Sequence, residues 1–316
     1  MPCYKPLTGY YSKYVNKSGK RSIVFNSDKA LIPVKQQVPC GRCIGCRLDR
    51  SLSWAIRCVN EASMYDENSF ITLTFDDDHI ADNRSLRVSD FQKFMKRLRK
   101  AISPRKVRFF HCGEYGAKFS RPHHHACLFG YDFSDKVLFS ERNGSKVYTS
   151  AMLSNLWPFG FSTVGSVTFE SAAYVARYVM KKWAKDNFSG VELYDAMKAL
   201  KNPQSKADFY NGMKEEYITM SRRPGIGETW YKQFSSDVYP LGFCVVNGKK
   251  VKPPRYYDNQ FEIDNSLSFA RIKVDRLKGA QGNINNTPAR LEVREELKKR
   301  LTNQLTRGYE NEVTSI

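Results

Sequence analysis

The sequence feature that most constrains the fold is the stretch at residues 107–131, VRFFHCGEYGAKFSRPHHHACLFGY. Its first part is rich in β-branched and aromatic residues, two glycines and a proline interrupt the middle, and a second apolar run begins at His123. This pattern predicts two strands joined by a loop. Successive side chains of a strand point to opposite faces, so we expect His123 and His125 on one face and His124 on the other.

A carboxylate lies close to these histidines in the expected hairpin. Glu114 ends the first predicted strand, and pairing of the two strands would bring Glu114, His123 and His125 onto one sheet face. Two imidazoles and one carboxylate form a facial ligand set for a divalent metal, with open positions for a substrate. The alternative is a solvated strand with ordinary polar residues. Three of the chain's 5 histidines fall in one tripeptide, which favours the metal site.

A second group of metal-ligating residues lies near the N-terminus, in the segment PCGRCIGC. Cys40, Cys43 and Cys46 follow a C-x2-C-x2-C spacing, and Cys3 is the other cysteine of this region. Four thiolates would complete a tetrahedral site for structural Zn²⁺. The usual pattern of two separate cysteine pairs is absent, so free thiols at a helix start and an iron–sulfur cluster remain alternative interpretations.

A third pattern is the segment SAAYVARYVMKKWAKD at residues 171–186, which we expect to be helical. Tyr174, Tyr178 and Lys182 recur every four residues and would share one helix face. The pKa of a free phenol is about 10, so attack by tyrosine at neutral pH needs a nearby lysine or metal. These tyrosines are therefore either nucleophiles or core aromatics packed on a sheet. The metal site predicted beside them favours nucleophiles.

The remaining periodicity predicts a mixed fold in which a strand, a helix and two strands follow one another. A capping box of Ser89 and Gln92 is expected to open the helix that precedes the two-strand segment. Residues 76–78, three aspartates, are expected to form a turn, and residues 132–150 show no clear element. Further expected elements are strands at 22–25, 69–75 and 161–169, helices at 46–65, 151–157 and 190–201, a hairpin at 243–251, and a final helix from Pro288 that carries Leu297, Leu301 and Leu305.

The charge of the chain indicates a polyanionic partner. Lys and Arg number 51 against 32 acidic residues, a formal charge of +19, and 18 Tyr and 20 Phe could stack on bases. Nucleic acid is the expected partner. No apolar run is long enough to span a bilayer, and no secretory signal is evident, so we expect a cytoplasmic protein with no membrane partner. No phosphate-binding G-x4-G-K-[ST] motif is present, so we expect no ATPase or helicase module.

Three segments, FITLTFDDD, GEYGAKFSRPHHHACLFG and YVARYVMKK, resemble in this order the three motifs of HUH-type rolling-circle replication initiators. The segments MPCYKPLTGY, PCGRCIGCRLDRS, SRRPGIG and PPRYYD resemble the initiators of gokushovirus-type microviruses, so the likeness covers most of the chain. One departure is the middle HUH position, which is usually apolar and is His124 here. An offset of the ligand pair by one residue therefore stays open.

The resemblance implies an α+β fold with a central antiparallel sheet and flanking helices. We expect an N-terminal cysteine-containing segment at residues 1–66, a nuclease core at 67–188 and a C-terminal extension at 189–316. The family's ligands for Mg²⁺ or Mn²⁺ fall on His123, His125 and Glu114. Its nucleophiles fall on Tyr174 and Tyr178, with Lys182 beside them.

The implied activity is nicking of a viral replication origin. Tyrosine transesterification would leave a covalent 5′-phosphotyrosine, free a 3′-OH for synthesis by a host polymerase, and later rejoin the ends into a circle. The partners would be viral DNA and host replication proteins in the bacterial cytoplasm. Two alternatives remain: a relaxase or transposase of the same superfamily, and a non-catalytic, zinc-stabilised nucleic-acid-binding protein.

Overall fold

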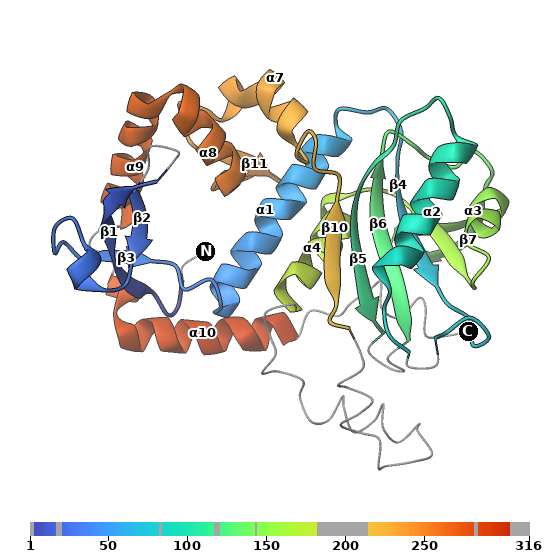
Figure 1. The fold of residues 1–316 in the computed structure, drawn as a ribbon, viewed down its shortest axis with the longest axis horizontal. Coiled ribbons are helices and arrows are strands. Elements are labelled where there is room, and N and C mark those ends of the chain that lie inside the picture. The colour runs from blue at the N-terminus through green and yellow to red at the C-terminus, as the bar shows by residue number, and fades with distance from the viewer. Residues whose placement is uncertain are drawn as a thin grey trace, which may run out of the picture. The chain divides into compact units, whose positions relative to one another are not determined.

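The computed structural model describes residues 3–16, 21–81, 84–116, 121–142, 144–181, 214–280 and 284–303. Figure 1 shows the helices and strands that these residues form. Among the described residues the chain forms two compact units. One consists of the residues up to Asp49 together with those from Ala280 onward, and the other of Arg50–Gly279. No helix in the described ranges is long and apolar enough to cross a membrane. The helix expected at 190–201 lies outside the described residues.

The larger unit is built on a seven-stranded antiparallel sheet with the order β10-β5-β6-β4-β9-β8-β7. Its strands are β4 (Asn68–Thr74), β5 (Arg108–Tyr115), β6 (Pro122–Phe129), β7 (Lys136–Arg142), β8 (Ser145–Ser150), β9 (Ser162–Gly165) and β10 (Tyr217–Met220). Every residue of β6 is buried, and so is almost all of β4, because helices cover both faces of the sheet. The expected α+β fold with a central antiparallel sheet is confirmed.

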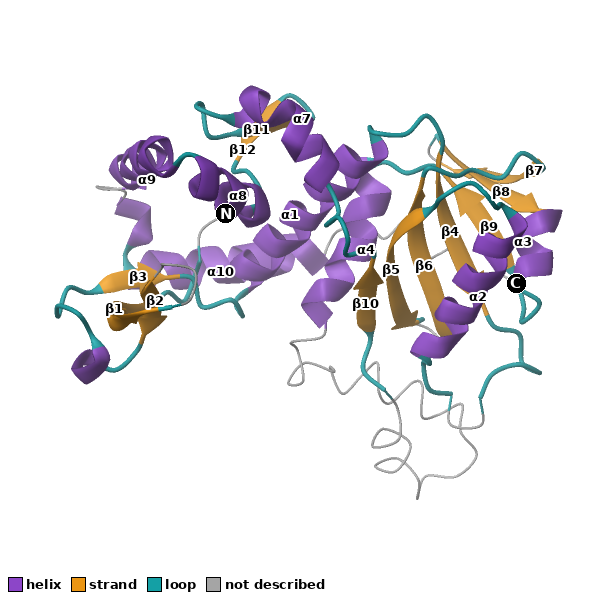
Figure 2. Ribbon diagram, turned by 45° about the horizontal axis from the view of Figure 1, so that its top comes forward, coloured by secondary structure: helices purple, strands orange, loops and turns teal. Residues whose placement is uncertain are grey.

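Two helix pairs cover the two faces of this sheet. Helices α2 (Val88–Ala101) and α3 (Ala151–Leu156) lie on one face (Figure 2), where Phe94 and Trp157 are fully buried. Helices α1 (Ile44–Ala62) and α4 (Phe169–Lys181) supply the core of the other face, through residues such as Ala55 and Val175. Each helix has an apolar side turned to the sheet, as helical spacing of apolar residues predicts.

The C-terminal part of the larger unit packs on the same helix α1. It contains a two-stranded hairpin and three helices, and Ile56 of α1 joins their apolar core. The elements are α7 (Glu228–Val238), β11 (Cys244–Val246), β12 (Lys249–Val251), α8 (Arg255–Asp264) and α9 (Ser266–Ala280). The hairpin lies where the sequence predicts it, and Asn247 and Gly248 both have positive φ, 47° and 73°, as a type I′ turn requires.

The smaller unit contains a three-stranded sheet and the last described helix. The sheet has the order β2-β1-β3, and helix α10 begins at Pro288 as predicted. On α10, Leu291 is buried but Leu297 and Leu301 are exposed, so those two leucines do not pack on a core within the described residues. The elements are β1 (Leu7–Val15), β2 (Arg21–Val24), η1 (Ser27–Lys29), β3 (Gln36–Val38), η3 (Ile284–Asn286) and α10 (Pro288–Asn303).

Three local expectations are wrong. The capping box is absent, because α2 begins at Val88 with an extended Arg87 before it, which puts Ser89 inside the first turn. Residues 132–150 form the strand pair β7–β8, whose turn contains Gly144 with φ of 76°. The strand expected at 161–169 ends at Gly165, and its last residue, Phe169, already starts α4. The aspartates at 76–78 do lie in a turn region, as expected.

Candidate metal and tyrosine site

Strand register brings the predicted metal ligands together. β5 and β6 pair antiparallel, with Glu114 directly opposite His123 and Cys112 opposite His125. Side chains paired across two strands share a face, so Glu114 meets both histidines on the face that α1 and α4 cover. All three residues are buried, and one ligand atom from each lies within 4.8 Å of the others.

The contacts within this triad converge on one carboxylate oxygen. His123 Nε2 lies 2.5 Å from Glu114 Oε1, and His125 Nε2 lies 2.8 Å from the same oxygen. Burial acts to raise the pKa of Glu114, but the two imidazoles outweigh it and hold that pKa well below its ordinary value of 4.5. Glu114 is therefore a carboxylate at neutral pH, the form that ligates metals.

The opposite ring nitrogens of the two histidines are held by other groups. His125 Nδ1 lies 2.9 Å from Thr72 Oγ1 on the neighbouring strand β4, and His123 Nδ1 lies 3.0 Å from the carbonyl oxygen of Arg121. A carbonyl oxygen only accepts, so Nδ1 of His123 carries the proton. The lone pair of a neutral His123 is then on Nε2, which faces Glu114. Such bonds orient the histidines of metal sites.

These residues fit a divalent cation. Glu114 Oε2 is buried and has no hydrogen-bond partner among the described residues. A buried carboxylate oxygen without a partner is costly, and a cation held by the three residues would supply one. The donor set of two imidazoles and a carboxylate suits Mn²⁺ among other divalent metals.

Helix α4 brings a tyrosine hydroxyl onto the triad. Tyr174 is buried, and its Oη donates a hydrogen bond of 2.9 Å to Glu114 Oε1. Its ring meets the His125 ring edge-on, with 5.0 Å between centroids. The sequence left open whether this residue is a core aromatic or a site residue. Tyr174 is both a core aromatic and a site residue, because its ring lies in the core and its hydroxyl contacts Glu114.

The two other residues predicted on that helix face lie at the edge of what the structure describes. Tyr178 belongs to α4, one turn after Tyr174, but its side chain is outside the described part of the chain. Lys182 follows the end of the helix and is also outside the described residues. Their proposed roles therefore stay predictions.

His124 lies on the opposite sheet face, as strand alternation predicts. There it forms a buried pair with His111, with 3.2 Å between His124 Nδ1 and His111 Nε2. His111 in turn contacts Thr219 Oγ1 at 2.8 Å and stacks on Phe91 with 3.5 Å between ring centroids. Burial, and then the neighbouring imidazoles, lower the pKa of His124 to about 3. The one-residue offset of the ligand pair would put His124 in the site, and this geometry does not support it.

Sequence reasoning missed the threonines of β4. Thr72 pairs with His125 and Thr74 with His123, so both lie on the site face. Thr74 Oγ1 is buried without a hydrogen-bond partner among the described residues. The alternating segment SFITLTF does place Thr72 and Thr74 on one face of a strand. This placement points to the site only once β4 is known to lie beside β6.

The structure also brings the predicted cysteines together, in the smaller unit. Cys3, Cys40, Cys43 and Cys46 are free thiols whose sulfur atoms all lie within 4.8 Å of one another. The second candidate metal group is thus formed as the sequence predicts. It belongs to residues outside the larger unit and does not contribute to the triad.

The fold and this site are consistent with an HUH-like core: an antiparallel sheet with two histidines and a glutamate on one face and a helix tyrosine above them. Residues 68–183 match the family model of the replication-associated protein ORF2/G2P. This range begins at β4 and runs past α4, so it contains the triad and both tyrosines.

Relatives with the same description cover more of the chain. The replication-associated protein VP4 of Bdellovibrio phage phiMH2K is 32% identical over 272 residues, which is 83% of this chain and 78% of the relative. The replication-associated protein ORF2 of Spiroplasma virus 4 is 32% identical over 72% of this chain and 69% of its own length. The replication-associated protein ORF4 of Chlamydia phage 1 is 36% identical over 46% of this chain and 38% of its own length.

The chain therefore belongs to the family of phage replication-associated proteins. No solved structure matches it. The expected resemblance to the replication proteins of microvirus-type phages is confirmed.

Proposed function

We propose that this protein initiates replication of a small single-stranded DNA phage by cutting one strand of the viral origin and joining itself to the new 5′ end. The observation that carries the proposal is the 2.9 Å hydrogen bond between Tyr174 Oη and Glu114 Oε1. It puts a potential nucleophile against a candidate metal-ligating triad. The names of the relatives, all replication-associated proteins, support the biological role.

The proposed step is a transesterification. Tyr174 Oη attacks the phosphorus of the scissile phosphodiester, a new P–Oη bond forms, and the bond from phosphorus to the 3′ oxygen breaks. The phenol loses its proton and the departing 3′ oxygen gains one, which leaves a free 3′-OH. One phosphodiester replaces another, so the bond energy is conserved and rejoining needs no ATP.

His123, His125 and Glu114 are the residues that would hold Mg²⁺ or Mn²⁺ in this proposal. When bound, the ion would draw negative charge from the phosphate oxygens during attack. Thr72 and the Arg121 carbonyl keep both Nε2 atoms facing Glu114 through the bonds described above. Glu114 accepts the bond from Tyr174 and thereby orients the phenol oxygen.

We assign the second nucleophile to Tyr178 and assistance of the phenolate to Lys182. Two tyrosines allow one to hold the old 5′ end while the other cuts the regenerated origin. The freed 3′-OH then attacks the first phosphotyrosine and closes a circle. The formal charge of +19 suits a single-stranded DNA partner. Host helicase and polymerase would complete the cycle in the bacterial cytoplasm.

The test uses the full-length protein, Mn²⁺ and oligonucleotides that tile the origin region of the phage genome. Label at the 3′ end should appear on denatured protein, because the protein keeps the 5′ phosphate of that fragment. Label at the 5′ end should appear on a free fragment with a 3′-OH. Peptide mapping of the adduct should find Tyr174 or Tyr178.

Two results would contradict the proposal. DNA binding with no adduct for any oligonucleotide would support the non-catalytic nucleic-acid-binding protein. An adduct on a different residue would remove both tyrosines as nucleophiles. A relaxase or transposase would form the same adduct, and the names of the relatives favour replication over these.

A further inference from the structure

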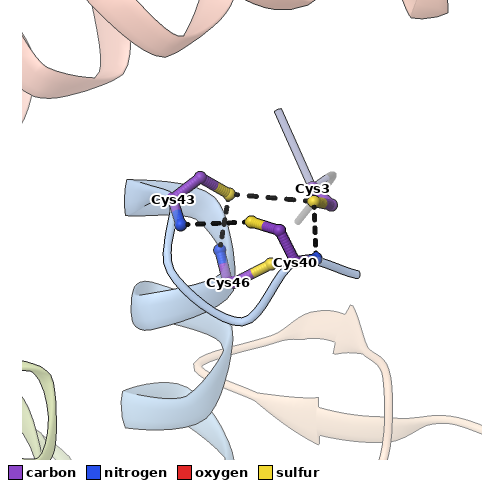
Figure 3. A group of neighbouring side chains, drawn as sticks. All are labelled: Cys3, Cys40, Cys43 and Cys46. Carbon is purple, nitrogen blue, oxygen red and sulfur yellow. Dashed lines mark hydrogen bonds between the residues drawn. The ribbon is translucent and has the colours of Figure 1, made fainter. Parts of the chain in front are cut away.

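The four N-terminal cysteines form a compact group that the proposed nicking reaction does not use. Cys3 comes from the segment before β1, Cys40 and Cys43 from the turn before α1, and Cys46 from the first turn of α1 (Figure 3). Residues far apart in sequence are thus brought to one point. All four sulfur atoms lie within 4.8 Å of one another, and none of the four cysteines is in a disulfide.

The spacing of the sulfurs matches a single tetrahedral ion. Cys3 Sγ and Cys43 Sγ are 3.9 Å apart. With a Zn–S bond of about 2.3 Å, a tetrahedron places neighbouring sulfurs about 3.8 Å apart. A disulfide would need about 2.05 Å. The observed separation is far too long for the covalent bond and close to the edge of the zinc tetrahedron.

Backbone amides surround the sulfurs in the way that stabilises thiolates. Cys40 N donates to Cys3 Sγ at 3.2 Å, and Cys43 N donates to Cys40 Sγ at 3.3 Å. Tyr4 N donates to Cys43 Sγ at 3.3 Å, and Cys46 N donates to the same sulfur at 3.5 Å. Amide donors to ligand atoms orient a metal site and favour the charged form of the ligand.

The charge that four ligated cysteines would carry also calls for a cation. Cysteine binds a metal as the thiolate, so the four ligands together bring a large negative charge. Several thiolates at these separations repel one another, and a divalent cation removes that repulsion.

We propose that Cys3, Cys40, Cys43 and Cys46 bind one structural Zn²⁺ that fastens the N-terminal segment to the start of α1. The set is closed, because four protein ligands leave no open position for a substrate. A cluster of several irons would hold its cysteine sulfurs farther apart than one ion does, so this geometry argues against the iron–sulfur interpretation.

The zinc site also stabilises the attachment of helix α10. Tyr4, next to Cys3, is buried in an apolar cluster with Cys43 and with Leu291 of α10. Lys5 Nζ lies 3.6 Å from Glu295 Oε2 on the same helix. Fixing Cys3 therefore fixes the residues that hold α10. Loss of the ion should loosen the N-terminal segment and α10 together, within the smaller unit.

The test measures metal content in the full-length protein, produced with zinc in the medium and purified without a metal-affinity column. Mass spectrometry of metals should find about one zinc per chain, as expected for a single four-cysteine site. Cys40→Ser with Cys43→Ser should lose the zinc. Cys244→Ser removes a buried thiol of the larger unit and should keep it. His123→Ala with His125→Ala should also keep it, so this test is independent of the nicking proposal.

A wild-type measurement covers the case in which the double cysteine variant fails to fold. Replacement of zinc by Co²⁺ should give the intense visible and near-ultraviolet absorption of tetrahedral thiolate ligation. Titration of the thiols with a mercurial reagent should release the zinc. Three results would each overturn the proposal: wild-type protein without zinc, wild-type protein with iron in place of zinc, and equal zinc content in the Cys40→Ser/Cys43→Ser variant.

Discussion

Each histidine of the triad is oriented by a hydrogen bond at Nδ1, the ring nitrogen that faces away from Glu114. His125 has its Nδ1 against the hydroxyl of Thr72, whereas His123 has a backbone carbonyl that no substitution removes. Thr72 therefore offers a side chain through which the orientation of a ligand histidine can be tested. Thr72 is buried on β4, and its hydroxyl contacts the ring of His125, so we assign it a positioning role.

The change Thr72→Val keeps the shape of the side chain and removes its hydroxyl. We expect the Mn²⁺ concentration for half-maximal adduct formation to rise about 10- to 100-fold, the usual effect of losing a group that orients a metal ligand. Thr72→Ser should restore the wild-type value, because it restores the hydroxyl. A Mn²⁺ titration checks this, and an unchanged midpoint in Thr72→Val would show that the bond does not matter for metal binding.

Changing a tyrosine to phenylalanine tests the chemistry of its hydroxyl without changing the packing of its ring. Tyr174→Phe keeps a buried ring and removes only the hydroxyl that contacts Glu114, so the fold should persist. If Tyr174 and Tyr178 are the two nucleophiles, each single change to Phe should block part of the cut-and-join cycle. The double change should lower adduct formation by at least about 100-fold, since nucleophile loss is among the largest effects in catalysis.

The measurement is gel quantification of the covalent adduct, with thermal unfolding as the control for folding. Tyr231→Phe is a matched control, because Tyr231 is also buried but lies in the core around α7 and α8. Full adduct formation by the Tyr174→Phe/Tyr178→Phe protein would exclude both residues as the attachment site.

At the scale of elements, the hairpin of β5 and β6 was predictable because its alternation and its turn residues lie in one continuous segment. The strands that lie beside this hairpin in the sheet could not be predicted. β4 lies beside β6 and β10 beside β5, and both pairings join segments far apart in sequence. Thr72 and Thr219, the partners of His125 and His111, are therefore visible only in the folded chain. Local pattern carries no information about such pairings.

Helix α7 shows a second reason for missed elements. Its start depends on Gly227, whose φ of 73° is open to glycine and strained for other residues. The backbone N–H of Gly227 donates to Glu61 Oε2 at 2.6 Å, while Glu61 Oε1 accepts from Arg108 Nε at 2.5 Å. A buried carboxylate on α1 thus fixes the beginning of a helix more than a hundred residues later. The apolar residues around α7 do not recur clearly at helical spacing, so the local sequence does not predict this helix.

The histidine pair between the sheet and α2 makes the stability of that layer depend on pH. Burial, and then the neighbouring imidazoles of His124 and His125, hold the pKa of His111 well below its ordinary value of 6.5. The unfolded chain binds this proton near pH 6.5 and the folded chain does not. The contribution of a neutral, buried His111 is therefore fully present above pH 6.5 and is lost as the pH falls.

We expect wild-type protein to lose about 1.4 kcal/mol more unfolding free energy than His111→Gln between pH 7.5 and pH 5.5. Glutamine keeps a hydrogen-bonding side chain beside Thr219 and His124 but does not titrate. Urea unfolding at both pH values measures the difference, and comparison of the two proteins cancels the other histidines. Parallel pH profiles for the two proteins would show that His111 is not held neutral in the fold.

For the molecule as a whole, the excess of positive charge and the triad have separable roles in the proposed function. The formal charge of +19 is a sum over the entire chain, whereas the triad is three buried side chains. Affinity for single-stranded DNA should therefore depend on salt and hardly at all on the triad. Each phosphate contact releases counterions when DNA binds. For single strands, each contact adds about −0.7 to the slope of the logarithm of the binding constant against the logarithm of the salt concentration.

The change His123→Ala with His125→Ala tests this separation. We expect it to bind a single-stranded oligonucleotide within about threefold of wild type, with the same salt dependence, because the change removes no lysine or arginine. Adduct formation with Mn²⁺ should disappear, because only Glu114 of the proposed ligands remains. Fluorescence anisotropy at several salt concentrations gives the affinity, and a denaturing gel gives the adduct. Binding that collapsed together with cleavage would mean that the triad region holds the DNA itself, and equal cleavage by both proteins would remove the proposed metal from the reaction.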